Sequence, residues 1–156
     1  MIFQGIDKQS VELKITNYQF PENQDGDWDG NCLNIYLKVE SKVGKWQTID
    51  PSLTTWEVQE IIEWFDKITR DKEPEYRLLT FTEPNLSFEL LNEPTDNEKL
   101  IRIKFDLECR PKSATDDKEY FVDILADKNE IITIKERLKD ELNKYPERKP
   151  THICRP

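Results

Sequence analysis

The chain has 156 residues, and its 32 Asp and Glu outnumber its 23 Lys and Arg, so the formal net charge at pH 7 is −9. This length is typical of one domain, and so acidic a chain lacks the cationic face that non-specific binding to nucleic acid requires. Hydrophobic residues make up only 36%, which predicts a small core.

The sequence contains no targeting or membrane signal. The first ten residues have neither the basic n-region nor the apolar h-region of a secretory signal. No apolar run approaches the roughly 18 residues that a transmembrane helix needs. We therefore expect a cytoplasmic protein that does not bind a membrane.

The first half of the chain predicts strands followed by a helix. Apolar and polar residues alternate over residues 11–15 and 33–39, which is the period of a half-buried strand. A helical period follows, with Thr54 and Glu57 placed to form a capping box. Its apolar stripe consists of Val58, Ile61, Ile62, Phe65 and Ile68.

The second half repeats this order. Residues 86–90 and 101–109 alternate, while residues 121–125 are apolar on both sides of Asp123 and predict a more central strand. A second helical stripe, which Asp127 and Glu130 can cap, ends at Pro146. Its members are Ile131, Ile134, Leu138, Leu142 and Tyr145.

Together these patterns predict an α+β fold. We expect a meandering antiparallel sheet of about six to eight strands with two helices packed against it. Residues 1–148 form the single domain in this interpretation, and residues 149–156 form a flexible C-terminal tail.

The negative charge is concentrated in the middle of the chain. Residues 53–98 carry 12 acidic and 4 basic side chains, whereas residues 99–156 are slightly basic. The acids of the first helix lie off its apolar stripe, and they are Glu57, Glu60, Glu63 and Asp66. They form either an ordinary solvated helix face or a surface that attracts a basic partner.

A second acidic cluster precedes the strand at residues 33–39. Residues 25–31 match the opening of a calcium-binding loop, with acids at Asp25, Asp27 and Asp29, but Tyr36 occupies the position of the closing Glu. We therefore favour an Asx-rich turn over an ion site. Trp28 in this loop is either partly buried like most tryptophans or an anchor at an interface.

No constellation of residues predicts catalysis. The only histidine, His152, lies two residues from Cys154 near the chain end, where a catalytic pair would not be held rigidly. The other cysteines, Cys32 and Cys109, fall in alternating apolar runs and are expected to be buried thiols. The spacing of these residues predicts neither zinc nor disulfides, and the four glycines form no phosphate-binding loop.

Six stretches of the chain stand in a recognisable order. One reads Asp27-Trp28-Asp29-Gly30-Asn31-Cys32-Leu33-Asn34-Ile35, and the others are residues 18–21, 50–58, 81–90, 105–111 and 145–148. Together they resemble the WapI-type immunity proteins, with the first matching a D-x-W-D-x-N-x-L-N-I pattern. The resemblance implies a small cytoplasmic bacterial antitoxin with neither enzyme activity nor cofactor. In contact-dependent inhibition, such a protein neutralises the C-terminal domain, commonly a nuclease, of a wall-associated polymorphic toxin.

We therefore expect a non-enzymatic protein that binds a basic toxin domain and occludes it. The contact surface that we predict consists of Glu57, Glu60, Glu63 and Asp66, followed by Asp25, Asp27, Trp28 and Asp29. Two alternatives remain open, which are a β-domain with a pocket for a small ligand or substrate and a structural domain or assembly subunit.

Overall fold

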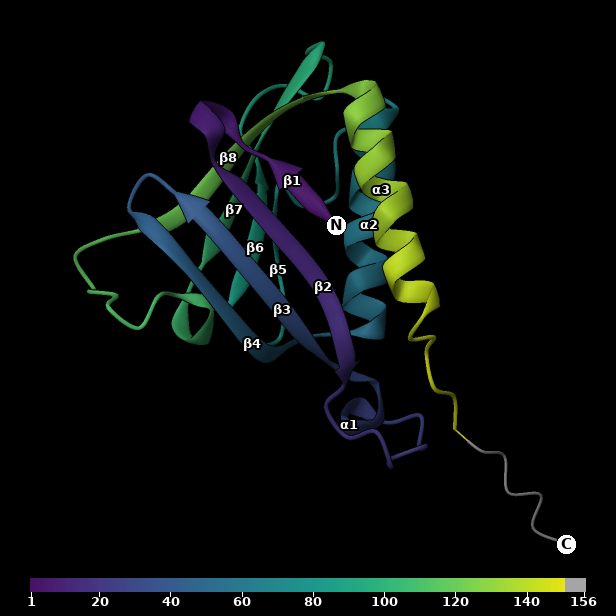
Figure 1. Ribbon diagram of the computed structural model, residues 1–156. Helices are drawn as coiled ribbons and strands as arrows, with labels where there is room; N and C mark the ends of the chain where they lie inside the picture. The colour runs from purple at the N-terminus through teal and green to yellow at the C-terminus, as the bar shows by residue number, and fades with distance from the viewer. Residues whose placement is uncertain (151–156) are drawn as a thin grey trace, which may run out of the picture.

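The computed structural model describes residues 1–150 and shows an α+β fold, as the sequence predicts. Eight strands form two antiparallel four-stranded sheets, in the orders β1-β2-β3-β4 and β5-β6-β7-β8. The sequence predicted one sheet, but α2 separates β4 from β5, so the meander is divided into two (Figure 1).

The first sheet holds the N-terminal third of the chain. Its strands are β1 (Ile2–Gln4), β2 (Ser10–Tyr18), β3 (Cys32–Ser41) and β4 (Gly44–Thr54). A short helix, α1 (Trp28–Asn31), lies between β2 and β3, where the sequence predicted only a turn. The register of β3 and β4 shifts at Ser52, and the neighbouring Pro51 is tolerated because β4 is an edge strand.

The second sheet and two long helices complete the fold. Helix α2 (Thr55–Thr69) leads to β5 (Leu78–Thr80), β6 (Leu86–Leu90), β7 (Glu98–Phe105), β8 (Tyr120–Asp127) and α3 (Lys128–Asn143). Short 3-10 turns follow β1 (Ile6–Lys8) and β7 (Leu107–Cys109). Both predicted capping boxes are present, at Thr54 with Glu57 and at Asp127 with Glu130.

One hydrophobic core lies between the two sheets and the helices. Phe3 of β1, Phe65 of α2 and Phe88 of β6 pack with ring centroids 6.1–6.4 Å apart. Helices α2 and α3 run side by side along one side of the sheets (Figure 1). All five stripe residues of the first predicted helix are buried, as the pattern predicted.

The prediction that residues 121–125 form a central strand is wrong. Strand β8 pairs only with β7 and is an edge strand. The outward-facing Phe121 is instead covered by the guanidinium of Arg102, whose Cζ lies 3.9 Å from the ring centroid. A cation over an aromatic ring therefore covers apolar surface that the sequence pattern assigned to a neighbouring strand.

Candidate partner-binding surface

The loop between β2 and β3 is fixed by the chain that follows α3. The Arg148 guanidinium lies 3.6 Å from the centroid of the Tyr18 ring. The Asn31 side chain holds the Arg148 backbone by two hydrogen bonds of 2.8 and 3.0 Å. The guanidinium also donates hydrogen bonds to four backbone carbonyls of the loop, those of Phe20, Pro21, Asn23 and Gly30.

Two glycines permit this close packing. A Cβ at Gly26 would lie 2.2 Å from the backbone nitrogen of Pro150, and a Cβ at Gly30 would lie 1.9 Å from the carbonyl oxygen of Asp25. Asp27 caps α1, because its Oδ1 accepts a hydrogen bond of 2.8 Å from the Gly30 N–H. Two residues of the predicted tail therefore approach the loop, and residues 151–156 lie outside the described residues.

Trp28 and Asp29 face outward from this ordered loop. Trp28 is 37% exposed and packs edge-on against Trp56, with ring centroids 5.3 Å apart. Trp56 lies in the first turn of α2, so the two acidic segments of the prediction meet at the start of that helix. Asp25 and Asp29 are exposed beside them.

Glu57 does not belong to the predicted surface, because it is buried. Its side chain is 4% exposed, and Oε2 accepts a hydrogen bond of 2.8 Å from the Thr54 N–H. Oε1 accepts a second one, of 2.9 Å, from the Thr82 N–H. The carboxylate thus caps α2 and ties it to the chain after β5, and the capping role that the sequence also predicted removes it from the surface.

Asp66 is partly exposed, and its charge is paired within the fold. Its carboxylate lies 2.9 Å from the Lys135 Nζ of α3 and 2.7 Å from the Arg70 Nη2. The hydrogen bond from Lys135 is the main cause that lowers the pKa of Asp66. This acid therefore joins α2 to α3.

Glu60 and Glu63 remain exposed on α2 and line a groove, named here the helix groove. Its volume is about 340 Å³, and Glu75, Tyr76 and Leu78 also line it. Burial and the neighbouring charges of Glu57 and Glu63 raise the pKa of Glu60. The groove holds three acids, Glu60, Glu63 and Glu75, against one cation, Lys67 of α2.

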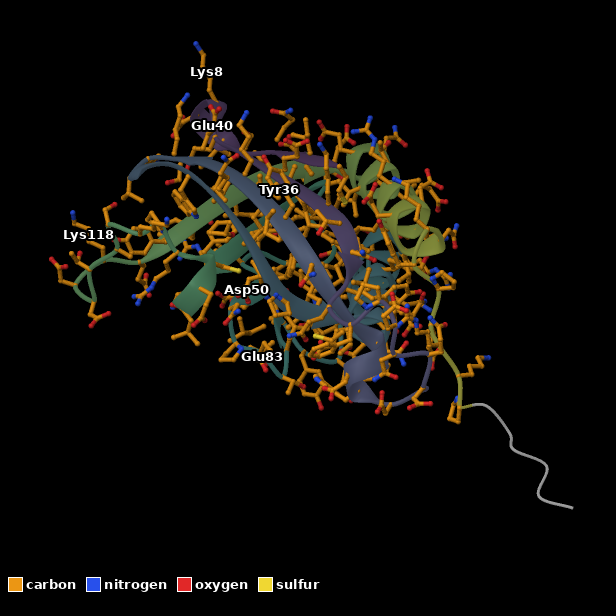
Figure 2. The ribbon with its side chains drawn as sticks, turned by 60° about the horizontal axis from the view of Figure 1, so that its bottom comes forward. Lys8, Tyr36, Glu40, Asp50, Glu83 and Lys118 are labelled. Atoms are coloured by element: carbon orange, nitrogen blue, oxygen red, sulfur yellow. The ribbon has the colours of Figure 1, made fainter. Side chains whose placement is uncertain are left out.

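A second groove opens beside Trp28, and we name it the Asp50 groove. Its volume is about 380 Å³. Figure 2, which turns the bottom of the molecule forward, shows Asp50 and Glu83 on this side. Four acids and two exposed aromatic residues from separate segments line the groove, namely Asp29, Asp50, Glu83, Glu108, Phe20 and Trp28.

The charges in the Asp50 groove are not neutralised within residues 1–150. None of its four acids forms an ion pair there, although the described chain pairs many other acids. Burial and the negative charge of Glu108 raise the pKa of Asp50. The groove therefore holds negative charge that a cation would stabilise.

The two grooves share no lining residue, but two segments link them. Trp56, which contacts Trp28, and Glu60 are one helical turn apart on α2 and so share a face. The end of β5 and the chain that follows it border one groove each, with Thr80 of β5 in the helix groove and Glu83 in the Asp50 groove. We name the combined surface the acidic band.

Sequence reasoning missed Asp50, Glu83, Glu108 and Arg148 as site residues. In an acidic sequence, isolated carboxylates give no signal of their own. A signal was nevertheless present, because all ten residues that line the Asp50 groove lie within the stretches that resemble the immunity family. Arg148, which holds the loop beside the groove, lies in the last of them.

The two described cysteines are buried, as predicted. Burial raises the pKa of Cys32 and of Cys109 to about 11, so both thiols are protonated at neutral pH. His152 and Cys154 lie outside the described residues. In residues 1–150, no group of His, Cys, Asp or Glu is arranged to hold a metal ion, and no helix is long and apolar enough to cross a membrane.

Comparison with known proteins supports the resemblance. Residues 1–146 match the model of the WapI-like immunity protein family. The matched residues include both sheets, all the helices and the acidic band. Searches of curated proteins and of solved structures gave no match. Because the match covers nearly the whole chain, this protein belongs to the WapI-like immunity protein family.

Proposed function

We propose that the protein binds the C-terminal toxic domain of a wall-associated polymorphic toxin through the acidic band and inactivates it by occlusion. The toxic domain in this proposal is a basic protein, and its activity is that of a nuclease. The protein acts in the cytoplasm as a stoichiometric inhibitor, without an enzyme activity or cofactor of its own.

One observation carries this choice of surface. The exposed acids Asp29, Glu60, Glu63 and Glu83 form no ion pairs within residues 1–150, while Asp66, on the same helix as Glu60, binds two cations. Like charges gathered on one surface repel each other and lower stability. A basic partner would remove this repulsion, so the band is complementary to a cationic protein.

An acidic surface is suited to inhibiting a nuclease. A nuclease holds phosphates with Lys and Arg, so its active cleft is cationic. An acidic protein is attracted to that cleft over long range, which raises the association rate. Once bound, it excludes the nucleic acid sterically.

A growth experiment tests the proposal. Cells that express the C-terminal domain of a candidate wall-associated toxin would be co-transformed with the wild-type protein, Glu63→Lys or Asp140→Lys. Both substitutions reverse one exposed charge on a helix, in the acidic band or on α3. We expect wild type and Asp140→Lys to restore growth, and Glu63→Lys to do so less well.

Two outcomes would contradict the proposal. If the wild-type protein neither restores growth nor co-purifies with the toxin domain, the immunity function is wrong. If it restores growth and Glu63→Lys protects as well as Asp140→Lys at every toxin level, α2 does not contribute to the contact.

A further inference from the structure

The Asp50 groove has acceptors that residues 1–150 leave free. Asp50 Oδ2 accepts hydrogen bonds from Asn85 Nδ2 at 2.7 Å and from Ser52 Oγ at 3.3 Å. Asp50 Oδ1 accepts none within residues 1–150, and the carboxylates of Glu83 and Glu108 also accept none there. The groove thus presents several acceptors in one small volume.

Asn85 adds an observation that is independent of the acids. The residue lines the groove and is only 2% exposed, yet its Oδ1 has no hydrogen-bond partner among the described residues. A buried polar atom without a partner is costly. Because this atom is an acceptor, a ligand that satisfies it must bring a hydrogen-bond donor.

The aromatic residues restrict the ligand further. Phe20 and Trp28 line the same groove and are 45% and 37% exposed. Aromatic faces attract cations, and a planar guanidinium both stacks on a ring and donates several hydrogen bonds in a fixed fork. An ammonium group can approach a ring and pair with a carboxylate, as Lys14 does with Tyr36 and Glu12, but it has neither a planar face that stacks nor a fixed fork of donors.

A guanidinium that stacks on a ring and donates to oxygen acceptors occurs at two other places in the chain. Arg102 stacks on Phe121 and donates two hydrogen bonds, of 2.8 and 3.0 Å, to the Asp123 carboxylate. Arg148 stacks on Tyr18 and donates to loop carbonyls. The Asp50 groove contains the same partners, carboxylates and aromatic faces, but within residues 1–150 it contains no guanidinium.

We infer that the Asp50 groove is a receptor for an arginine side chain of the protein partner, whose guanidinium stacks on Trp28 and donates to Asp50 and Glu83, beside the Asn85 Oδ1 that lacks a partner within residues 1–150. The identity of the partner as a toxin domain rests on the proposed function. The chemistry of the groove does not, because it follows from the described residues alone.

The test titrates the full-length protein with N-acetyl-arginine amide and follows the Trp28 indole N–H by NMR. N-acetyl-citrulline amide has nearly the same shape without the charge and is the matched control. We expect a saturable shift with arginine only. Asp50→Asn with Glu83→Gln should weaken its apparent affinity about tenfold, since a charge-assisted pair is lost, whereas Asp140→Asn, exposed on α3, should leave it unchanged.

Each result is decisive. Glu83→Gln alone replaces an exposed side chain and provides a folded variant if the double variant unfolds. Equal shifts with citrulline, or equal affinities in wild type and Glu83→Gln, would overturn the inference. A wild-type protein that fails to bind the toxin domain but still binds the arginine probe at this groove would refute the proposed function and leave the inference standing.

Discussion

Two regions of the molecule contain the same kinds of side chain in opposite states. On the outer face of β7 and β8, Asp123 is paired with Arg102, which covers Phe121. In the Asp50 groove, Asp50 lies near Trp28 and Glu83, and no cation pairs with it within residues 1–150. The first cluster is complete by itself, whereas the second lacks its cation.

This difference separates acids that stabilise the fold from acids that do not. Asp66, Glu57 and Asp123 each join two elements through ion pairs or hydrogen bonds. Asp50, by contrast, retains a charge that its own surroundings disfavour. Titratable groups held in such surroundings are candidates for function. Removing an acid of the first kind should therefore cost stability, and removing Asp50 should cost binding.

The largest expected effect concerns Arg148, which holds the loop beside the Asp50 groove. Arg148→Ala removes a guanidinium that contacts four loop carbonyls and the Tyr18 ring, and it should lower the free energy of unfolding by about 3 kcal/mol. Chemical denaturation measures this change. Lys149→Ala, which removes a neighbouring exposed cation, should change stability by less than about 0.5 kcal/mol. Equal effects would mean that Arg148 does not fix the loop.

The next largest effect on stability is expected at Glu57. Glu57→Ala removes the capping box of α2 and leaves the Thr82 N–H without its partner, so it should lower the free energy of unfolding by about 2 kcal/mol. The salt dependence of association with the toxin domain should stay as in wild type, because Glu57 is buried. If Glu57→Ala keeps full stability but its association depends less on salt, Glu57 belongs to the contact surface after all.

The same substitution, Asp to Asn, can be made in both regions, and its two effects on stability test the comparison directly. Asp123→Asn loses the pair with Arg102 and should lower the free energy of unfolding by about 1 kcal/mol. Asp50→Asn should leave the melting temperature at pH 7 unchanged or raise it. The raised pKa of Asp50 means that the folded state holds its proton more tightly than the unfolded state, so its ionisation costs stability.

The pH dependence of the Asp50 variant has a definite sign. The cost is absent below the unfolded pKa, develops as the pH rises through the raised folded value, and is complete above it. Wild type and Asp50→Asn should therefore differ least in acid and most at neutral pH. Ser52, Asn85 and Glu108 surround this carboxylate and stay the same in both proteins. A wild type that gains stability relative to Asp50→Asn with rising pH would contradict this account.

The smallest effect concerns the thiols. In a Cys154→Ser variant only Cys32 and Cys109 remain, and their raised pKa values of about 11 predict negligible labelling by iodoacetamide at pH 7. Labelling should become rapid only in denaturant, when both thiols are exposed. Fast labelling of the native protein would mean that the Asp50 groove, which Cys32 lines, opens more readily than described.

Local patterns predicted the helices and their caps well, because periodicity and capping boxes are encoded within a few residues. The stripe from Val58 to Ile68 and the cap at Asp127 are examples. The same patterns could not divide the strands into two sheets, since strand pairing across α2 depends on tertiary packing. They also placed Phe121 in the sheet interior, because the covering Arg102 lies on another strand.

The candidate site was predicted only in part. Trp28, Asp29, Glu60 and Glu63 lie on the acidic band, whereas Glu57 and Asp66 have partners from elements distant in sequence, Thr82 and Lys135. Asp50, Glu83 and Glu108 come together only in the folded chain. Charge counting cannot distinguish a paired acid from an unpaired one, because the pairing is a tertiary property.

The central claim is that unpaired acids on one surface bind a basic toxin domain. Its most direct test is the association rate constant with that domain, measured by stopped flow over a range of ionic strengths for wild type, Glu60→Lys with Glu63→Lys, and Asp140→Lys. We predict that the wild-type rate falls steeply with salt, that the double variant is at least about tenfold slower at low salt with a flatter dependence, and that Asp140→Lys stays near wild type. Equal rates and equal salt dependences for all three proteins would contradict the claim.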